Sequence, residues 1–404
     1  MSVKMTIADL RIRLQDISSA IAQQKEILRA LEQDKSDVQR ELNGNFDPMA
    51  QLPLEISSDI FMHCLPETPG LDPATAPIFF LNICHAWSNI ALATPALWSA
   101  IYMKSPRTET FEQRFMTWIQ RASGLPISLA LRGSLDQHVQ ASVKQHTHRL
   151  HHLELYINSD DDLKHIAAAA FPHLKTLKIE GPFYRRGQRN PDTYISILCA
   201  APSLVECEFI KMYYLPAFHG TQPKRLTHAS LQHLRLAKPH WKHHSETVES
   251  AQILRYLTLP ALQTLILPLF DRVPARAFLS FLEHSSPPLQ SLCMNPDGPG
   301  TFATISPNPL HFLDVVLAPD PGFLPNLRSL TILSKSGPHF PYGDLISLLV
   351  ARRASHHAQP LQAFHLDFKD GIIRAPHADV LSALRQLVDD GMIIRVGPEE
   401  RNLI

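Results

Sequence analysis

The strongest constraint on the fold is a short apolar pattern that recurs eight times between residues 150 and 366. Each copy has apolar side chains at its first, fourth and sixth positions, as in Leu231-x-x-Leu234-x-Leu236. The last two positions are two residues apart, which is the spacing of side chains on one face of a β-strand. The pattern therefore predicts eight short strands, beginning near Leu150, Leu174, Leu204, Leu231, Leu262, Leu289, Leu327 and Leu361.

Segments with helical periodicity separate the strands, and a proline often precedes a strand, as Pro172 and Pro260 do. The copies begin 24 to 38 residues apart, a period that resembles that of leucine-rich repeats. The resemblance implies that residues 105–404 form an irregular right-handed solenoid with a parallel sheet, because a single unit cannot bury its own apolar face. The alternative is an ordinary α/β domain. We expect flanking strands at 127–131 and 392–396, and helices at 194–200, 246–256, 275–283, 344–353 and 378–389.

In the first 45 residues, apolar side chains recur on average every 3.5 residues, which predicts a coiled-coil helix over 1–45. Asn43-Gly44-Asn45 is expected to end this helix. The a positions are Ile7, Leu14, Ile21, Leu28, Lys35 and Leu42, and the d positions are Leu10, Ile17, Gln24, Leu31 and Val38. A parallel homodimer would have no complementary ion pair at its flanks: the pairs would be Arg13–Ser18, Ala20–Lys25, Ile27–Glu32 and Asp34–Gln39. Either this helix forms a homodimer, or it lies as one amphipathic helix on its own protein or on another partner.

Residues 46–104 are rich in large apolar side chains and are divided by prolines. Apolar residues at three- and four-residue spacing predict one helix after Pro53, a second after Pro77 and a third apolar cluster after Pro95. Three helices of this size cannot bury so much Leu, Ile, Phe and Trp among themselves. Part of this apolar surface is therefore expected to contact a neighbour.

Four motifs follow one another in this segment: Leu52-Pro53-x-Glu55-Ile56, Ile60-Phe61-x-x-Cys64-Leu65-Pro66, Leu81-x-Ile83-Cys84-x-x-Trp87-x-x-Ile90 and Thr94-Pro95-x-Leu97-Trp98. Their order resembles the F-box of large families of fungal F-box-like proteins, although the spacer from Glu67 to Ala76 is longer than usual. The resemblance implies a trihelical unit that binds a Skp-family adaptor through Leu52, Pro53, Ile56, Ile60, Phe61, Cys84 and Trp87. Alternatively, these side chains form only the core of a small helical unit.

The predicted strands also define a polar surface. Residues beside the last two apolar positions of each copy point away from the buried face, toward the concave side of a solenoid. In the first half of the array these residues are charged or aromatic, and a protein substrate could bind there. The proposed substrate-binding residues are His152, Glu154, Tyr156, Thr176, Lys178, Glu206, Glu208, His233 and Arg235. The alternative is that they are simply hydrated strand residues.

Composition excludes several classes of function. The 404 residues include 38 Lys+Arg and 38 Asp+Glu, so the chain lacks the net charge of a general nucleic-acid or anionic-membrane binder. Residues 73–103 carry no charged side chain, but prolines and polar residues interrupt them, which disfavours a membrane span. Five cysteines without a C-x-x-C pair, and the absence of a secretory leader, favour the cytoplasm or the nucleus.

The sequence contains no nucleotide-binding, serine-hydrolase or zinc-protease signature. Histidines cluster at 146, 148, 151 and 152, but no cysteine pair or acidic residue stands at zinc-ligand spacing. We therefore expect no catalytic residue, no metal and no cofactor.

The resemblance implies a substrate-recognition subunit of an SCF-type cullin ubiquitin ligase, in which the chemistry of ubiquitin transfer belongs to other subunits. Its partners would be the adaptor, the cullin scaffold and an unidentified protein substrate. The main alternative is a non-catalytic interaction scaffold without a ligase role. An enzyme with an unrecognised site is a third alternative, which would show a deep pocket with shifted pKa values.

Overall fold

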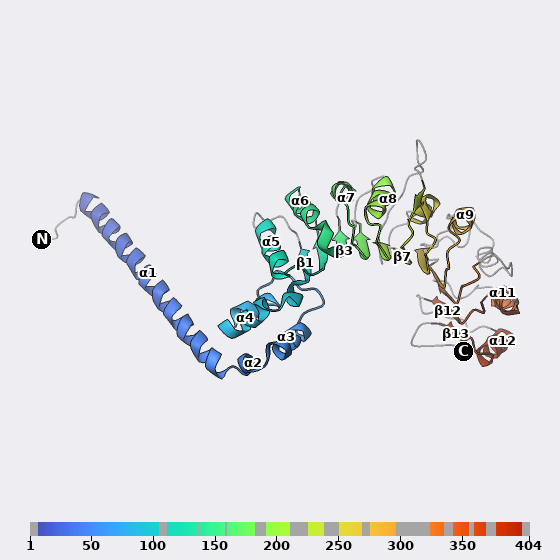
Figure 1. Cartoon of the computed structure of the whole chain (residues 1–404), viewed down its shortest axis with the longest axis horizontal. Coiled ribbons are helices and arrows are strands. Elements are labelled where there is room, and N and C mark those ends of the chain that lie inside the picture. The colour runs from blue at the N-terminus through green and yellow to red at the C-terminus, as the bar shows by residue number, and fades with distance from the viewer. Residues whose placement is uncertain are drawn as a thin grey trace. The chain divides into compact units, whose positions relative to one another are not determined.

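The structure, a computed structural model, describes residues 7–104, 111–133, 135, 137–157, 160–181, 191–210, 225–237, 250–268, 275–295, 324–334, 342–354, 359–368 and 377–397. In these ranges the chain is a mixed α/β protein with one long parallel sheet (Figure 1). Two compact units are present: residues 1–101 with 118–125, and residues 102–117 with 126–404. Of the helices in the described ranges, none is long and apolar enough to cross a membrane.

The first unit begins with the long helix α1, Ile7–Phe46. The helix continues two residues past the predicted stop at Gly44 and ends before Asp47. Asp47 has extended backbone, and its carboxylate accepts a hydrogen bond from the Met49 amide at 2.9 Å, which caps the next helix, α2 (Pro48–Gln51). The cap and Pro48 at the first helical position therefore mark the boundary more strongly than Gly44 does.

Four short helical segments follow: α3 (Leu54–His63), the 3₁₀ helix η1 (Ile78–Asn82), α4 (His85–Leu92) and the 3₁₀ helix η2 (Pro95–Trp98). The second predicted helix is thus divided in two, because the backbone of Cys84 is extended, with φ −156° and ψ 173°. The predicted third cluster is a single turn that leads into the strand β1, Ala100–Lys104. Alternate burial of Ile101 and Met103 explains why this part is a strand.

The long sheet contains eleven strands in the order β1-β2-β3-β4-β5-β7-β9-β10-β11-β12-β13. Each neighbouring pair from β2 to β13 is parallel. A separate parallel pair joins β6 (Leu226–Thr227) to β8 (Leu257–Thr258). The other strands are β2 (Ile127–Arg132), β3 (Leu150–Tyr156), β4 (Thr176–Glu180), β5 (Glu206–Ile210), β7 (His233–Ala237), β9 (Thr264–Pro268), β10 (Ser291–Asn295), β11 (Ser329–Ser334), β12 (Ala363–Phe368) and β13 (Ile393–Val396).

Helices connect the strands, and Figure 1 shows α6, α7 and α8 along the same side of the neighbouring strands. The helical segments are α5 (Phe111–Arg121), α6 (Gln137–Gln145), η3 (Thr147–Arg149), α7 (Asp160–Ala167), α8 (Pro191–Ala200), η4 (Ser250–Tyr256), α9 (Ala275–Ser285), α11 (Tyr342–Ala354) and α12 (Ala378–Asp389). The segment predicted as a helix over 246–256 is a 3₁₀ helix from Ser250, and residues 246–249 lie outside the described ranges.

All eight copies of the apolar pattern form strands, as predicted, and so do both flanking segments. In each copy the three apolar positions are buried; in the first, Leu150, Leu153 and Leu155 are all 0% exposed. These side chains form the core of the second unit. Strands β1, β6 and β8 were not predicted.

Candidate functional site

The nine proposed substrate-binding residues lie on the polar face of β3, β4, β5 and β7, opposite the buried leucines. Strand register brings four of them into one line across the sheet, which we call the charged row: Glu154, Lys178, Glu208 and Arg235. Their charges alternate from strand to strand. The row therefore places each carboxylate beside at least one cation on a neighbouring strand.

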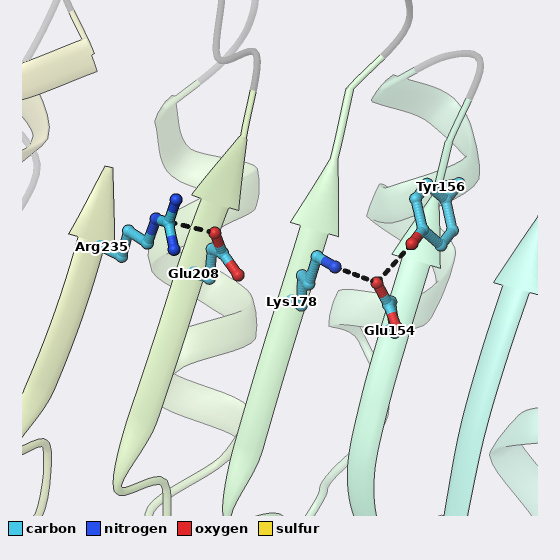
Figure 2. A network of polar contacts seen from close by, with 5 residues as sticks. All are labelled: Glu154, Tyr156, Lys178, Glu208 and Arg235. Carbon is cyan, nitrogen blue, oxygen red and sulfur yellow. Dashed lines mark hydrogen bonds and ion pairs between the residues drawn. The ribbon is translucent and has the colours of Figure 1, made fainter. Parts of the chain in front are cut away.

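Two ion pairs join members of the charged row (Figure 2). The Lys178 ammonium contacts the Glu154 carboxylate, and Arg235 Nε lies 3.0 Å from Glu208 Oε1. The hydroxyl of Tyr156 donates a second hydrogen bond to Glu154 Oε1, at 2.5 Å. The Glu154 carboxylate is thus bound by Tyr156 of the same strand, β3, and by Lys178 of the neighbouring strand, β4.

Burial and these contacts shift the pKa values of three groups. Burial alone would raise the pKa of Glu154, but the hydrogen bonds from Lys178 and Tyr156 outweigh it and the pKa is lowered. Burial would lower the pKa of Lys178, whereas its bond to Glu154 raises it, and the net direction is upward. Burial, and then the bond to Glu154, raise the pKa of Tyr156 to about 12. At neutral pH the Glu154–Lys178 pair is therefore ionised and the Tyr156 phenol keeps its proton.

Tyr156 also stands among cations. The Arg132 guanidinium lies 5.5 Å and the Lys178 ammonium 5.6 Å from the centre of its ring, which is within cation–π range. The ring is therefore fixed by its hydroxyl and by the two cations, and it presents a rigid aromatic surface at the end of β3.

A second line of residues runs beside the charged row and contains His152, Thr176, Glu206 and His233. Burial, the largest cause, lowers the pKa of His152, so its imidazole is neutral at pH 7. Glu206 is exposed and His233 half-buried. This line therefore offers the neutral His152 imidazole and the Thr176 hydroxyl near the exposed Glu206 carboxylate.

Among the described residues, no group of three or more His, Cys, Asp or Glu side chains could hold a metal ion. Cys207, between Glu206 and Glu208 in sequence, faces the core, and burial raises the pKa of its thiol well above the usual value. The alternating charges are best suited to a partner that offers the opposite alternation at strand spacing.

The seven proposed adaptor-binding residues, all in the first unit, divide into two groups. Leu52, Ile56 and Ile60, which follow one another every four residues, are 40%, 51% and 39% exposed, and Pro53 is exposed as well. We call Leu52, Ile56 and Ile60 the α3 apolar face; Ile56 and Ile60 belong to α3, and Leu52 lies two residues before it. In contrast, Phe61 and Cys84 are buried and Trp87 is half-buried.

The buried group forms the core behind the α3 apolar face. The Phe61 and Phe80 rings stack with their centres 4.1 Å apart, and the Trp87 ring lies 5.0 Å from that of Phe61. The indole N–H of Trp87 donates to Asp47 Oδ2, and the Cys84 thiol donates to the same oxygen at 3.4 Å. Asp47 was missed at the sequence level, because it lies 40 residues before Trp87 and belongs to no motif. Phe61, Cys84 and Trp87 thus hold the helices together.

Two other sequence features have structural rather than chemical roles. Among the clustered histidines, His146 lies against the Met116 sulfur at 3.2 Å and 6.4 Å from the ring of His148, and His151 lies beside the ring of His173. The acidic residues Asp160, Asp161 and Asp162 form the first turn of helix α7, Asp160–Ala167. A comparison of the chain with models of protein families found no match, and a comparison with curated proteins found none either.

Proposed function

We propose that this chain is the substrate-recognition subunit of an SCF-type cullin ubiquitin ligase. Residues 46–104 would act as an F-box-like unit that binds a Skp-family adaptor, and the second unit as an irregular leucine-rich-repeat solenoid that binds the substrate. The chain would supply proximity: it would hold a substrate near an activated ubiquitin and raise its effective concentration.

The observation that carries the proposal is the α3 apolar face. Ile56 and Ile60 are exposed on one side of α3, and Leu52 is exposed two residues before this helix, while a stacked aromatic core fixes the helix from behind. An apolar surface on a rigid support is typical of interface hot spots, because little conformational entropy is lost when it binds.

The solenoid assignment is supported by strand order and by burial. Within the array, the strand of each copy pairs with the strands beside it in the sheet order, and the first leucine of each copy is buried. Stacked units of this kind leave one continuous polar face. On that face the charged row and Tyr156 would recognise a substrate segment by alternating charge and one aromatic contact.

The test is co-expression with the Skp-family adaptor of the source organism, followed by purification of the complex. The wild type should retain the adaptor, and a Leu52→Ala/Ile56→Ala/Ile60→Ala variant should lose at least about tenfold in affinity, because each truncation removes exposed apolar contact area. Val350→Ala/Val388→Ala is the matched control: it truncates two side chains that are 48% and 38% exposed, in the second unit.

Folding is checked by the thermal transition, which should be the same in all three proteins because none of the substituted side chains is buried. If the folded wild type retains no adaptor, the ligase role is refuted. A non-catalytic interaction scaffold would then be the better proposal, since burial of Phe61 and Cys84 already shows that part of the motif has a structural role.

A further inference from the structure

The long helix α1 exposes an apolar stripe along its length. The eight apolar heptad residues whose exposure is described are each 50–68% exposed, and they are Leu10, Leu14, Ile17, Ile21, Leu28, Leu31, Val38 and Leu42. The stripe is therefore not covered by the described residues of the same chain. Two polar residues interrupt it, Gln24 at a d position and Lys35 at an a position, and both are exposed.

We propose that this stripe binds a second copy of the same helix in antiparallel orientation, centred between Arg29 and Ala30. The proposal is independent of the ligase role. It rests on how the two polar interruptions fall when the helix is paired with itself, since the facing residues of a coiled coil are fixed by the heptad register.

In an antiparallel pair, each a residue faces a d residue of the other helix. With this centre, Leu28 faces Leu31 of the second copy, Ile21 faces Val38, and Leu42 faces Ile17. Lys35 then faces Gln24, so the two polar residues share one layer on each side of the centre. Residues 17–42, about 39 Å of helix at 1.5 Å per residue, thus contain no layer that mixes a polar with an apolar residue.

Other registers lack this match. Moving the centre by half a heptad toward the N-terminus places Lys35 against Ile17 and Gln24 against Leu28. Moving it by the same amount the other way places Lys35 against Leu31 and Gln24 against Leu42. Each shift buries polar groups against apolar side chains, which costs free energy without a compensating hydrogen bond.

The parallel arrangement is disfavoured by charge. It places Lys35 directly against Lys35 of the second copy, and no g–e′ pair at its flanks is complementary. In the antiparallel register, Lys25 and Glu32 of the second copy occupy facing e positions about 3 Å apart along the axis, and symmetry supplies the pair twice. Both side chains are exposed on the free helix and available for this contact.

The first test is the mass of the full-length chain by sedimentation equilibrium. The wild type should approach twice 45.5 kDa as its concentration rises. Leu28→Lys/Leu31→Lys should raise the dissociation constant at least about 100-fold, because it places lysines in the central layers. Ile12→Lys is the control: its side chain is 61% exposed at an f position, off the stripe, and the dimer should persist.

Disulfide trapping then determines the orientation. Exposed Cys64 and Cys199 are first replaced by Ser, and this background must not cross-link by itself. Ile21→Cys chains mixed with Val38→Cys chains, one of them tagged, should yield the mixed covalent dimer, whereas Ile21→Cys alone should yield little.

Efficient cross-linking of Ile21→Cys to itself would show a parallel pair and overturn the proposal. A monomeric mass at every concentration would overturn it as well. Neither result would affect the adaptor-binding test, because the α3 apolar face lies outside α1 and remains intact in all of these variants.

Discussion

The two ion pairs of the charged row should differ in strength, and a double-mutant cycle at each pair can measure the difference. The Glu154 and Lys178 side chains are 16% and 28% exposed, whereas Glu208 and Arg235 are 20% and 54% exposed. Water screens the second pair more strongly because its guanidinium is largely hydrated. The Glu154–Lys178 pair should therefore show the larger coupling free energy.

The magnitude follows from where this pair lies between two limits. Exposed ion pairs contribute roughly 0.2–1 kcal/mol, and removing one partner of a fully buried pair costs about 3–5 kcal/mol. A mostly shielded pair with a second donor, the Tyr156 hydroxyl, should have a coupling of about 1–2 kcal/mol. For Glu208 and Arg235 we expect about 0.5 kcal/mol, within the exposed range.

The substitutions are Glu154→Gln, Lys178→Met and both together, compared with Glu208→Gln, Arg235→Met and both together. Glutamine keeps an acceptor for Tyr156, so the cycle isolates the charge interaction. Urea unfolding gives the free energies, provided that the slope with urea is unchanged. Equal couplings at the two sites, or a larger coupling at Glu208–Arg235, would refute the reasoning from burial.

Three further predictions concern single sites. Asp47→Ala should lower the free energy of unfolding by about 1–2 kcal/mol in a thermal or urea melt, because Trp87 loses its hydrogen-bond acceptor and α2 loses its cap. Asp47→Asn should lower the free energy of unfolding by less. The pKa of Tyr156 rises in the folded state from 10.0 to about 12, so the stabilisation that the protonated phenol provides should be complete below pH 10 and lost as the pH approaches 12. Phenolate absorbance should show that Tyr156 ionises in this high pH range, and Tyr156→Phe should remove that absorbance change. Leu177→Ala should destabilise by about 2–5 kcal/mol in urea, and a neutral result would contradict its complete burial in β4, while Thr176→Ala on the polar face should be near neutral.

The strands of the sheet could be predicted because a few consecutive residues are enough to show which side chains of a strand are buried. In β3 and β4, two buried residues alternate with polar ones over five or six residues, and nothing distant is needed to recognise this spacing. The same alternation correctly placed all nine proposed substrate-binding residues on one face. Whether they bind a substrate stays a prediction.

Contacts between distant segments could not be predicted in this way. The hydrogen bond between Trp87 and Asp47 joins residues 40 positions apart, and no local pattern marks Asp47 as the acceptor for the Trp87 indole. The pairing of Glu154 with Lys178 depends on the register of the parallel strands β3 and β4, which the spacing within either strand does not specify. The break at Cys84 was also missed, because neither proline nor glycine marks it and the apolar spacing continues through it.

The order of the strands has a consequence for how the protein is made. From β2 to β13, each strand of the long sheet pairs with the strand formed just before it in that sheet. A chain that emerges from the ribosome can therefore add strands one at a time, without waiting for a distant segment of the sequence. While the sheet grows, its newest strand is an edge strand, and this position passes to β13 when the sheet is finished. That moving edge is where an incomplete chain would most need protection from aggregation.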